Sequence, residues 1–117
     1  YKNISAAILG EFMHGHVAVF NNKGALIYIA VDKISKRSVA NLEKIKADYN
    51  PRLVIIGPSA EELRPNFHIN ITCENEIQQL FANVLICQQL ALEIALKLKR
   101  NVDNPRGLHK VVVDKNI

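Results

Sequence analysis

A carboxylate and two imidazoles lie close together near the start of the chain. They belong to the segment Gly10-Glu11-Phe12-Met13-His14-Gly15-His16, at the predicted junction between a short helix and a loop. A histidine at such a junction can act as an acid–base group, because a nearby carboxylate fixes its tautomer. From spacing alone, however, a solvent-facing turn with a capping acid is the favoured interpretation. His14 and His16 could also supply two metal ligands, but no third ligand follows at a suitable spacing, so we expect no metal.

A second group of polar residues lies near the end of the chain, in the segment Asp103-Asn104-Pro105-Arg106-Gly107-Leu108-His109-Lys110. Arginine and lysine on a loop that proline and glycine constrain can hold a phosphate or a carboxylate. A partly desolvated lysine can also lose its proton and attack a carbonyl as a neutral amine. A solvated C-terminal tail is the alternative interpretation, and spacing alone favours it.

A third candidate is Gly57-Pro58-Ser59, which directly follows a predicted buried strand. Ligands of open α/β sheets bind beyond the carboxyl ends of the strands, although a simple turn would have the same sequence. The chain contains no GxGxxG motif and no Walker loop. Nothing therefore indicates a nucleotide, and we expect no cofactor.

Short apolar runs alternate with amphipathic segments, as in an α/β fold with a parallel sheet. Strands are predicted at 25–31, 52–56 and 67–72. The first is a continuous apolar run, which predicts a strand buried on both faces. A typical sheet has about five or six strands. We therefore expect that a strand and a helix precede Tyr1.

Helical periodicity predicts a short helix over 5–13 and two longer helices. The first of these runs from Ser35 or Ser38 to about Tyr49. The second covers 77–98, with Thr72 placed as its N-cap, and is apolar on more than one side. Polar residues interrupt this apolar segment, which argues against a membrane span. We expect its outer face to meet another domain or subunit.

Composition favours a single soluble domain. The chain has 117 residues, of which 49% are hydrophobic and 22% charged, so one core is the limit and a disordered tail is excluded. The net charge of +4 permits an anionic ligand, but the basic residues are spread along the chain, so we expect no nucleic-acid partner. Cys73 and Cys87 form no zinc or disulfide pattern, which favours a reducing cytoplasm.

The two polar clusters, taken in order, resemble a known enzyme family. Residues 10–15 resemble the G-E-[FL]-x-H-G motif in the second sugar-isomerase (SIS) domain of the glucosamine-6-phosphate synthases, the isomerising glutamine:fructose-6-phosphate aminotransferases. Residues 102–110 are similar to the closing D-x-P-R-N-L-A-K motif of that family, and 91–96 to the helix before it. The resemblance spans essentially the whole chain.

The resemblance implies a SIS-type three-layer αβα sandwich with a parallel sheet, here without its first strand and helix. We expect one partial SIS domain over 1–117, with 101–117 as a C-terminal loop or tail. The implied ligand is fructose 6-phosphate or a similar sugar phosphate, and the implied assembly is a cytoplasmic homodimer. A SIS-family deglycase or ketose–aldose isomerase and a non-catalytic phosphosugar-binding module are the alternatives.

The resemblance also implies roles for single residues. His14 matches a histidine that helps to open the cyclic sugar phosphate and that enters the site of the neighbouring subunit. Lys110 matches the lysine that forms a Schiff base with the open-chain ketose. We expect Glu11, Arg106 and His109 to contact the substrate.

This sequence also departs from the family pattern. His16 replaces a proline, and Gly107-Leu108-His109-Lys110 replaces N-L-A-K. The glutamate that serves the family as a base would precede Tyr1. We therefore expect no turnover by this chain alone.

Overall fold

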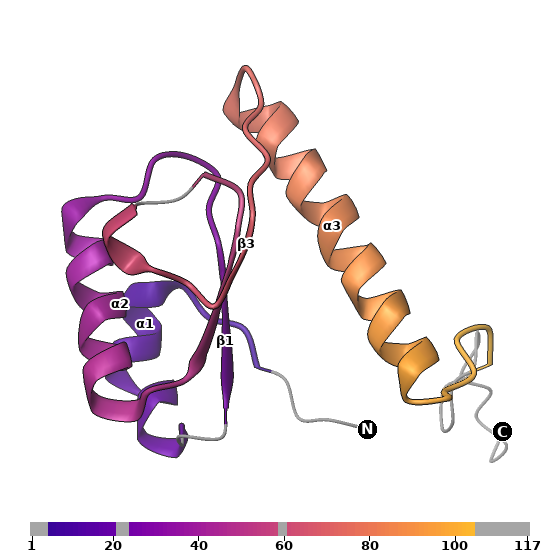
Figure 1. The fold of residues 1–117 in the computed structure, drawn as a ribbon, viewed down its shortest axis with the longest axis horizontal. Coiled ribbons are helices and arrows are strands. Elements are labelled where there is room, and N and C mark those ends of the chain that lie inside the picture. Colours follow the sequence, from indigo (N-terminus) through magenta and orange to yellow (C-terminus); the bar gives the residue numbers. More distant parts are fainter. Residues whose placement is uncertain (1–4, 21–23, 59–60, 105–117) are drawn as a thin grey trace, which may run out of the picture. The chain divides into compact units, whose positions relative to one another are not determined.

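A computed structural model describes residues 5–20, 24–58 and 61–104 (Figure 1). Its elements are α1 (Leu9–His14), the 3₁₀ helix η1 (His16–Val19), β1 (Ala25–Ile29), α2 (Lys36–Tyr49), β2 (Arg52–Ile56), the 3₁₀ helix η2 (Glu61–Leu63), β3 (Phe67–Ile69) and α3 (Glu76–Lys97). The chain divides into two compact units, 1–83 and 84–117. The predicted α/β class is confirmed.

The described strands form one parallel sheet in the order β1-β2-β3. In register, Ala25 to Ile29 lie opposite Arg52 to Ile56, and Val54 to Ile56 lie opposite Phe67 to Ile69. Because all three strands run in the same direction, the segments that follow them meet at one edge of the sheet. The third strand was predicted to reach Thr72, but it ends at Ile69.

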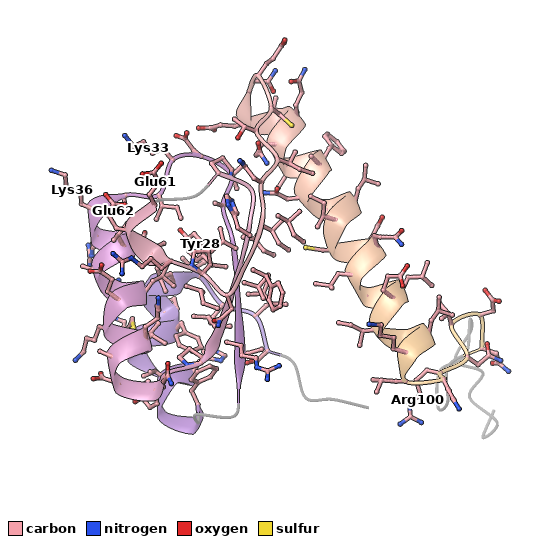
Figure 2. All side chains as sticks on the ribbon, viewed as in Figure 1. Tyr28, Lys33, Lys36, Glu61, Glu62 and Arg100 are labelled. Carbon is pink, nitrogen blue, oxygen red and sulfur yellow. The ribbon has the colours of Figure 1, made fainter. Side chains whose placement is uncertain are left out.

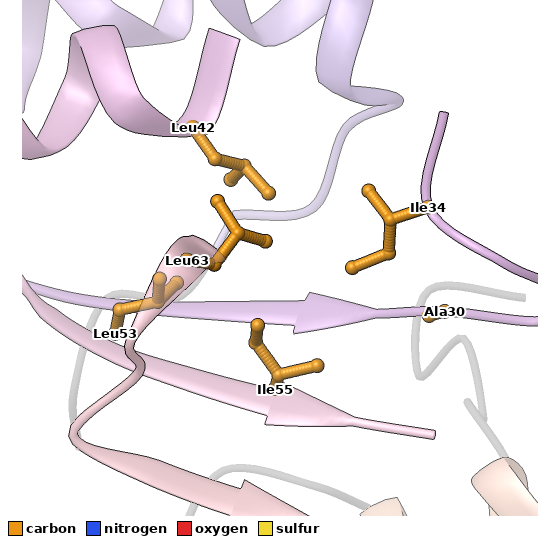
Figure 3. Packing of buried hydrophobic residues seen from close by; sticks show 6 residues of the cluster. All are labelled: Ala30, Ile34, Leu42, Leu53, Ile55 and Leu63. Carbon is orange, nitrogen blue, oxygen red and sulfur yellow. The ribbon is translucent and has the colours of Figure 1, made fainter. Parts of the chain in front are cut away.

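The core of the first unit lies between α2 and the sheet (Figure 3). Its buried members are Ala30, Ile34, Leu42, Leu53, Ile55 and Leu63. Burying one such leucine or isoleucine contributes about 1.5–3 kcal/mol. Leu9 of α1 packs against the same cluster, so α1 is held on the face of the sheet that α2 covers (Figure 1).

Local signals set both ends of α2. The Ser35 Oγ accepts a hydrogen bond from the Ser38 amide at 3.1 Å, which makes Ser35 the N-cap. Asn50 adopts the left-handed conformation, with φ 45° and ψ 50°, and Pro51 follows. Of the two predicted starts, Ser35 and Ser38, the structure has Ser35, and the predicted end before Asn50-Pro51 is confirmed.

The prediction that the first strand is buried on both faces is wrong for the described structure. Side chains of β1 alternate between half-buried and exposed. Leu26 and Tyr28 pack against the core, whereas Ile27 and Ile29 point to the opposite face and are 44% and 48% exposed. In the described structure, other residues therefore cover only one face of β1, although the whole strand is apolar.

The predicted cap of α3 is also wrong. The helix begins at Glu76, and the Asn75 Oδ1 accepts a hydrogen bond from the Gln78 amide at 2.9 Å. A capping side chain must directly precede the first turn to reach an amide three residues on, and Thr72 is too early. At the other end, the Arg100 amide donates to the Ala95 carbonyl at 2.8 Å, and Lys99 has a φ of 53°.

Apolar side chains on α3 are largely exposed among the described residues. Those most exposed are Ile77, Phe81, Leu85 and Leu96. By length and composition alone, α3 could cross a membrane. The polar residues within the helix therefore do not exclude a membrane span, although the sequence had indicated that they do. A single such helix is weak evidence, because core helices of soluble proteins pass the same test.

Candidate functional site

The first predicted cluster lies on and after α1. Glu11 and His14 are one helical turn apart, and both are exposed. The helix ends at His14, and Gly15 leaves the helical conformation. The structure thus presents the carboxylate and the imidazole to solvent from one short helix.

Aromatic rings hold this segment in place. The Phe12 ring stacks on the His16 ring, with centroids 6.1 Å apart, and meets Phe20 edge-on at 5.8 Å. Phe20 in turn meets Tyr49, in the last turn of α2, at 5.9 Å. Tyr49 lies just before Arg52, where β2 begins. These ring contacts therefore place the segment near the amino ends of the strands.

The structure gives His16 a packing role, because its ring lies against Phe12. Within the described ranges, no group of three His, Cys, Asp or Glu side chains is placed so that it could hold a metal ion. Cys73 and Cys87 are both free thiols and partly buried.

Main-chain contacts tie the strand ends together at the carboxyl edge. The Ala30 amide donates to Ile56 O at 2.8 Å, and the Gly57 amide donates to Ile69 O at 3.0 Å. The His68 Nε2 lies 2.8 Å from Gly57 O, and a carbonyl can only accept, so Nε2 carries the proton of that hydrogen bond. The predicted Gly57 turn therefore lies where all three strand ends converge, although Ser59 falls outside the described residues.

Sequence reasoning missed the two buried amides at this edge. Gln79 and Asn83, on the first turns of α3, are only 2% and 1% exposed. The Asn83 Nδ2 donates to Ala30 O at 2.7 Å, and the Gln79 Nε2 donates to Ile71 O at 2.8 Å. The two side chains also bond to each other, from the Gln79 Nε2 to the Asn83 Oδ1, at 3.0 Å. The available signal was a pair of amides four residues apart near the start of an otherwise apolar helix.

Charged side chains of both signs flank this edge. Lys33 and Lys36 lie at the end of the unit where α2 begins, as do Glu61 and Glu62 of η2 (Figure 2). All four are exposed. Charge alone therefore does not mark this part of the surface as an anion site.

The described structure does not bring the predicted site residues together. Glu11 and His14 lie near the amino ends of the strands, away from the carboxyl edge where sheets of this kind bind ligands. Arg106, His109 and Lys110 lie outside the described residues.

Comparison with curated proteins shows one kind of relative. The chain is 31% identical over 115 residues to "Glutamine--fructose-6-phosphate aminotransferase [isomerizing]" of Methanococcus maripaludis. It is 28% identical to the proteins of the same name from Thermus thermophilus, over 116 residues, and Helicobacter pylori, over 113 residues. Each match covers 96% of this chain and 19% of the relative.

The chain thus spans about a fifth of the length of these relatives. No protein-family model matches it, and no solved structure gives a significant match. The parallel α/β sheet is consistent with the fold that the two motifs imply. The match confirms the resemblance: nearly the whole chain is similar to one part of the isomerising glutamine–fructose-6-phosphate aminotransferases, and that part fits a SIS domain.

Proposed function

We propose that this chain is the C-terminal SIS domain of an enzyme that acts on fructose 6-phosphate or a similar sugar phosphate. The observation that carries the proposal is the similarity of 96% of the chain to proteins whose names specify this sugar phosphate. The two polar clusters support it, because both lie within that stretch. We further propose that the domain works in the cytoplasm as a homodimer and needs no cofactor.

The proposed chemistry begins with ring opening. His14 passes a proton to the ring oxygen of the cyclic sugar phosphate while the anomeric hydroxyl loses its own proton, which leaves an open-chain ketose. The neutral amine of Lys110 then attacks the C2 carbonyl, water leaves, and a Schiff base remains. Arg106, His109 and Glu11 contact the phosphate and hydroxyl groups of the substrate.

The position of His14 supports an arrangement in which it serves a second copy of the chain. It is exposed, and the aromatic contacts of its segment place it near the amino ends of the strands. A ligand at the carboxyl edge of the same sheet is therefore out of its reach. In a twofold dimer, each His14 can approach the site of the partner.

Reductive trapping tests the proposal directly. The chain is incubated with fructose 6-phosphate and cyanoborohydride, which reduces an imine to a stable amine, and the modified lysine is located by peptide mass spectrometry. We expect the adduct on Lys110, and its loss in Lys110→Arg, which keeps the charge. Lys115→Arg is the matched control, since this lysine lies in the same tail and its change should leave the adduct in place.

Binding of fructose 6-phosphate, measured by titration calorimetry, separates the alternatives. Binding without an adduct favours the non-catalytic phosphosugar-binding module. An adduct on Lys110 is common to the synthase-like and isomerase-like alternatives, and the need for glutamine distinguishes these two. Absence of both binding and adduct contradicts the proposal.

A further inference from the structure

We infer that one face of α3 is the contact surface between two copies of this chain, with the two helices antiparallel. This face, here called the α3 stripe, follows one side of the helix from its first turn to its last. Its members are Ile77, Phe81, Leu85, Gln88, Leu92 and Leu96. The inference rests on the proposed function only for the homodimer, and it names the surface that the homodimer uses.

The apolar members of the α3 stripe are uncovered among the described residues. Ile77, Phe81 and Leu85 are 70%, 67% and 66% exposed, and Leu96 is 55% exposed. An α-helix has about 3.6 residues per turn, which brings the stripe together on one side and puts the buried amides of Gln79 and Asn83 on the other. A row of large apolar side chains that faces away from the buried side of its own helix indicates a partner.

The spacing of the α3 stripe favours a second copy as that partner. Successive members are four, four, three, four and four residues apart, so the stripe reads the same from either end. A twofold contact places the same surface of both copies against itself. When two copies of α3 cross antiparallel at the midpoint of the stripe, each member meets the one equally far from the midpoint. Ile77 then meets the partner's Leu96, and Phe81 meets the partner's Leu92.

Charges at the two ends of α3 favour the antiparallel orientation. Glu74 and Glu76 lie at its start, whereas Lys97 and Lys99 lie at its end, and all four are exposed. Antiparallel helices place the acidic end of one beside the basic end of the other, whereas parallel helices would place like charges together. Because no member of the stripe is itself charged, these end charges set the orientation.

A charge at the centre of the α3 stripe tests the contact. In Leu85→Glu, the twofold symmetry places two carboxylates close together at the crossing point, where the second helix removes them from water. Ile94→Glu is the matched control, because it adds the same charge to the same helix at an isoleucine that is 43% exposed and lies off the stripe. Circular dichroism verifies that the variants are folded. Gln88→Glu replaces a polar member of the stripe and makes the same test if Leu85→Glu does not fold.

Sedimentation equilibrium measures the association of each protein at equal concentrations and without ligand. We expect the wild type and Ile94→Glu to form dimers with similar dissociation constants. For Leu85→Glu we expect a dissociation constant at least about tenfold higher, since like charges that meet in an interface are strongly unfavourable.

Cross-linking tests the orientation. Chains carrying Phe81→Cys are mixed with chains carrying Leu92→Cys, treated with a short bismaleimide, and the joined peptides are identified by mass spectrometry. Antiparallel helices predict that position 81 is joined mainly to position 92. Parallel helices predict joining between identical positions.

The outcomes separate this inference from the proposed function. A dimer that persists in Leu85→Glu, equal weakening by Ile94→Glu, or joining mainly between identical positions overturns the inference and leaves the proposed homodimer intact. A monomeric wild type overturns both, while the lysine adduct still tests the sugar-phosphate chemistry. If that monomer sediments with phosphatidylcholine vesicles, and Leu85→Glu does not, the stripe faces a membrane instead of a second copy.

Discussion

The carbonyl oxygen of Ala30 occupies the space that a β-carbon on Gly57 would need. Gly57 has a φ of 96°, in a region that residues with a side chain rarely adopt. The same Ala30 oxygen accepts a hydrogen bond from Asn83. The segments after β1 and β2 can therefore approach each other this closely only because residue 57 is a glycine.

Replacing Gly57 by alanine should destabilise the fold by about 2 kcal/mol or more, because it combines a strained φ with a main-chain clash. Gly10→Ala is the matched control. A β-carbon on Gly10 meets nothing within 4 Å, and the residue lies in α1, so we expect a gain of up to about 0.5 kcal/mol. Urea unfolding followed by circular dichroism measures both, and equal effects at the two glycines would contradict the described close approach.

Lys46 connects α2 to η2. Its Nζ donates to Leu63 O at 2.6 Å and lies 3.2 Å from Arg64 O. We expect Lys46→Met to lower the free energy of unfolding by about 1–2 kcal/mol, because these carbonyls lose a charged donor. Lys44→Met, on the same helix, removes an exposed ion pair with Asp48 and should cost at most about 0.5 kcal/mol. Urea unfolding that ranks Lys44 above Lys46 would refute this role.

Within the described ranges, three non-glycine residues have a positive φ, and they should respond differently to glycine. These are Asn50, Arg64 and Lys99, with φ of 45°, 42° and 53°. Lys99→Gly should stabilise α3 by about 0.5 kcal/mol, since glycine adopts this conformation at a helix end without a steric penalty. Asn50→Gly should change little, because asparagine tolerates the region well. Thermal melting followed at the helical circular dichroism band compares the two, and a loss of helix stability in Lys99→Gly would contradict the prediction.

Much of the fold could be predicted from local patterns. The apolar runs located all three described strands, and Ser35 and Asn50-Pro51 set the ends of α2, because caps and breakers act on neighbouring residues. Coverage of a strand depends on distant elements. For that reason the apolar run of β1 did not reveal that Ile27 and Ile29 are exposed in the described structure.

The candidate site was less accessible to sequence reasoning. The sequence shows Asn83 only as a polar interruption in an apolar helix. The structure shows a side chain whose partner, Ala30, lies 53 residues earlier in the chain. No local pattern encodes such a pairing. Lys110 was found through the motif alone, and it lies outside the described residues.

The placement of His14 leads to a test of the proposed dimer. His14→Ala alone should slow formation of the trapped adduct on Lys110, because ring opening limits the supply of open-chain ketose. Lys110→Arg alone should abolish the adduct. When both variants are expressed together, random pairing makes half of the dimers hybrid, and each hybrid has one site with both residues intact.

We therefore expect the co-expressed variants to recover about a quarter of the wild-type rate of adduct formation. The controls are the two variants expressed separately at the same total concentration. If His14 instead acts on Lys110 of its own chain, no hybrid contains a complete site, and the mixture stays at the average of the separate variants. Recovery above that average thus requires that a histidine near the amino ends of one sheet reaches a lysine of another copy, which its exposed position on α1 permits.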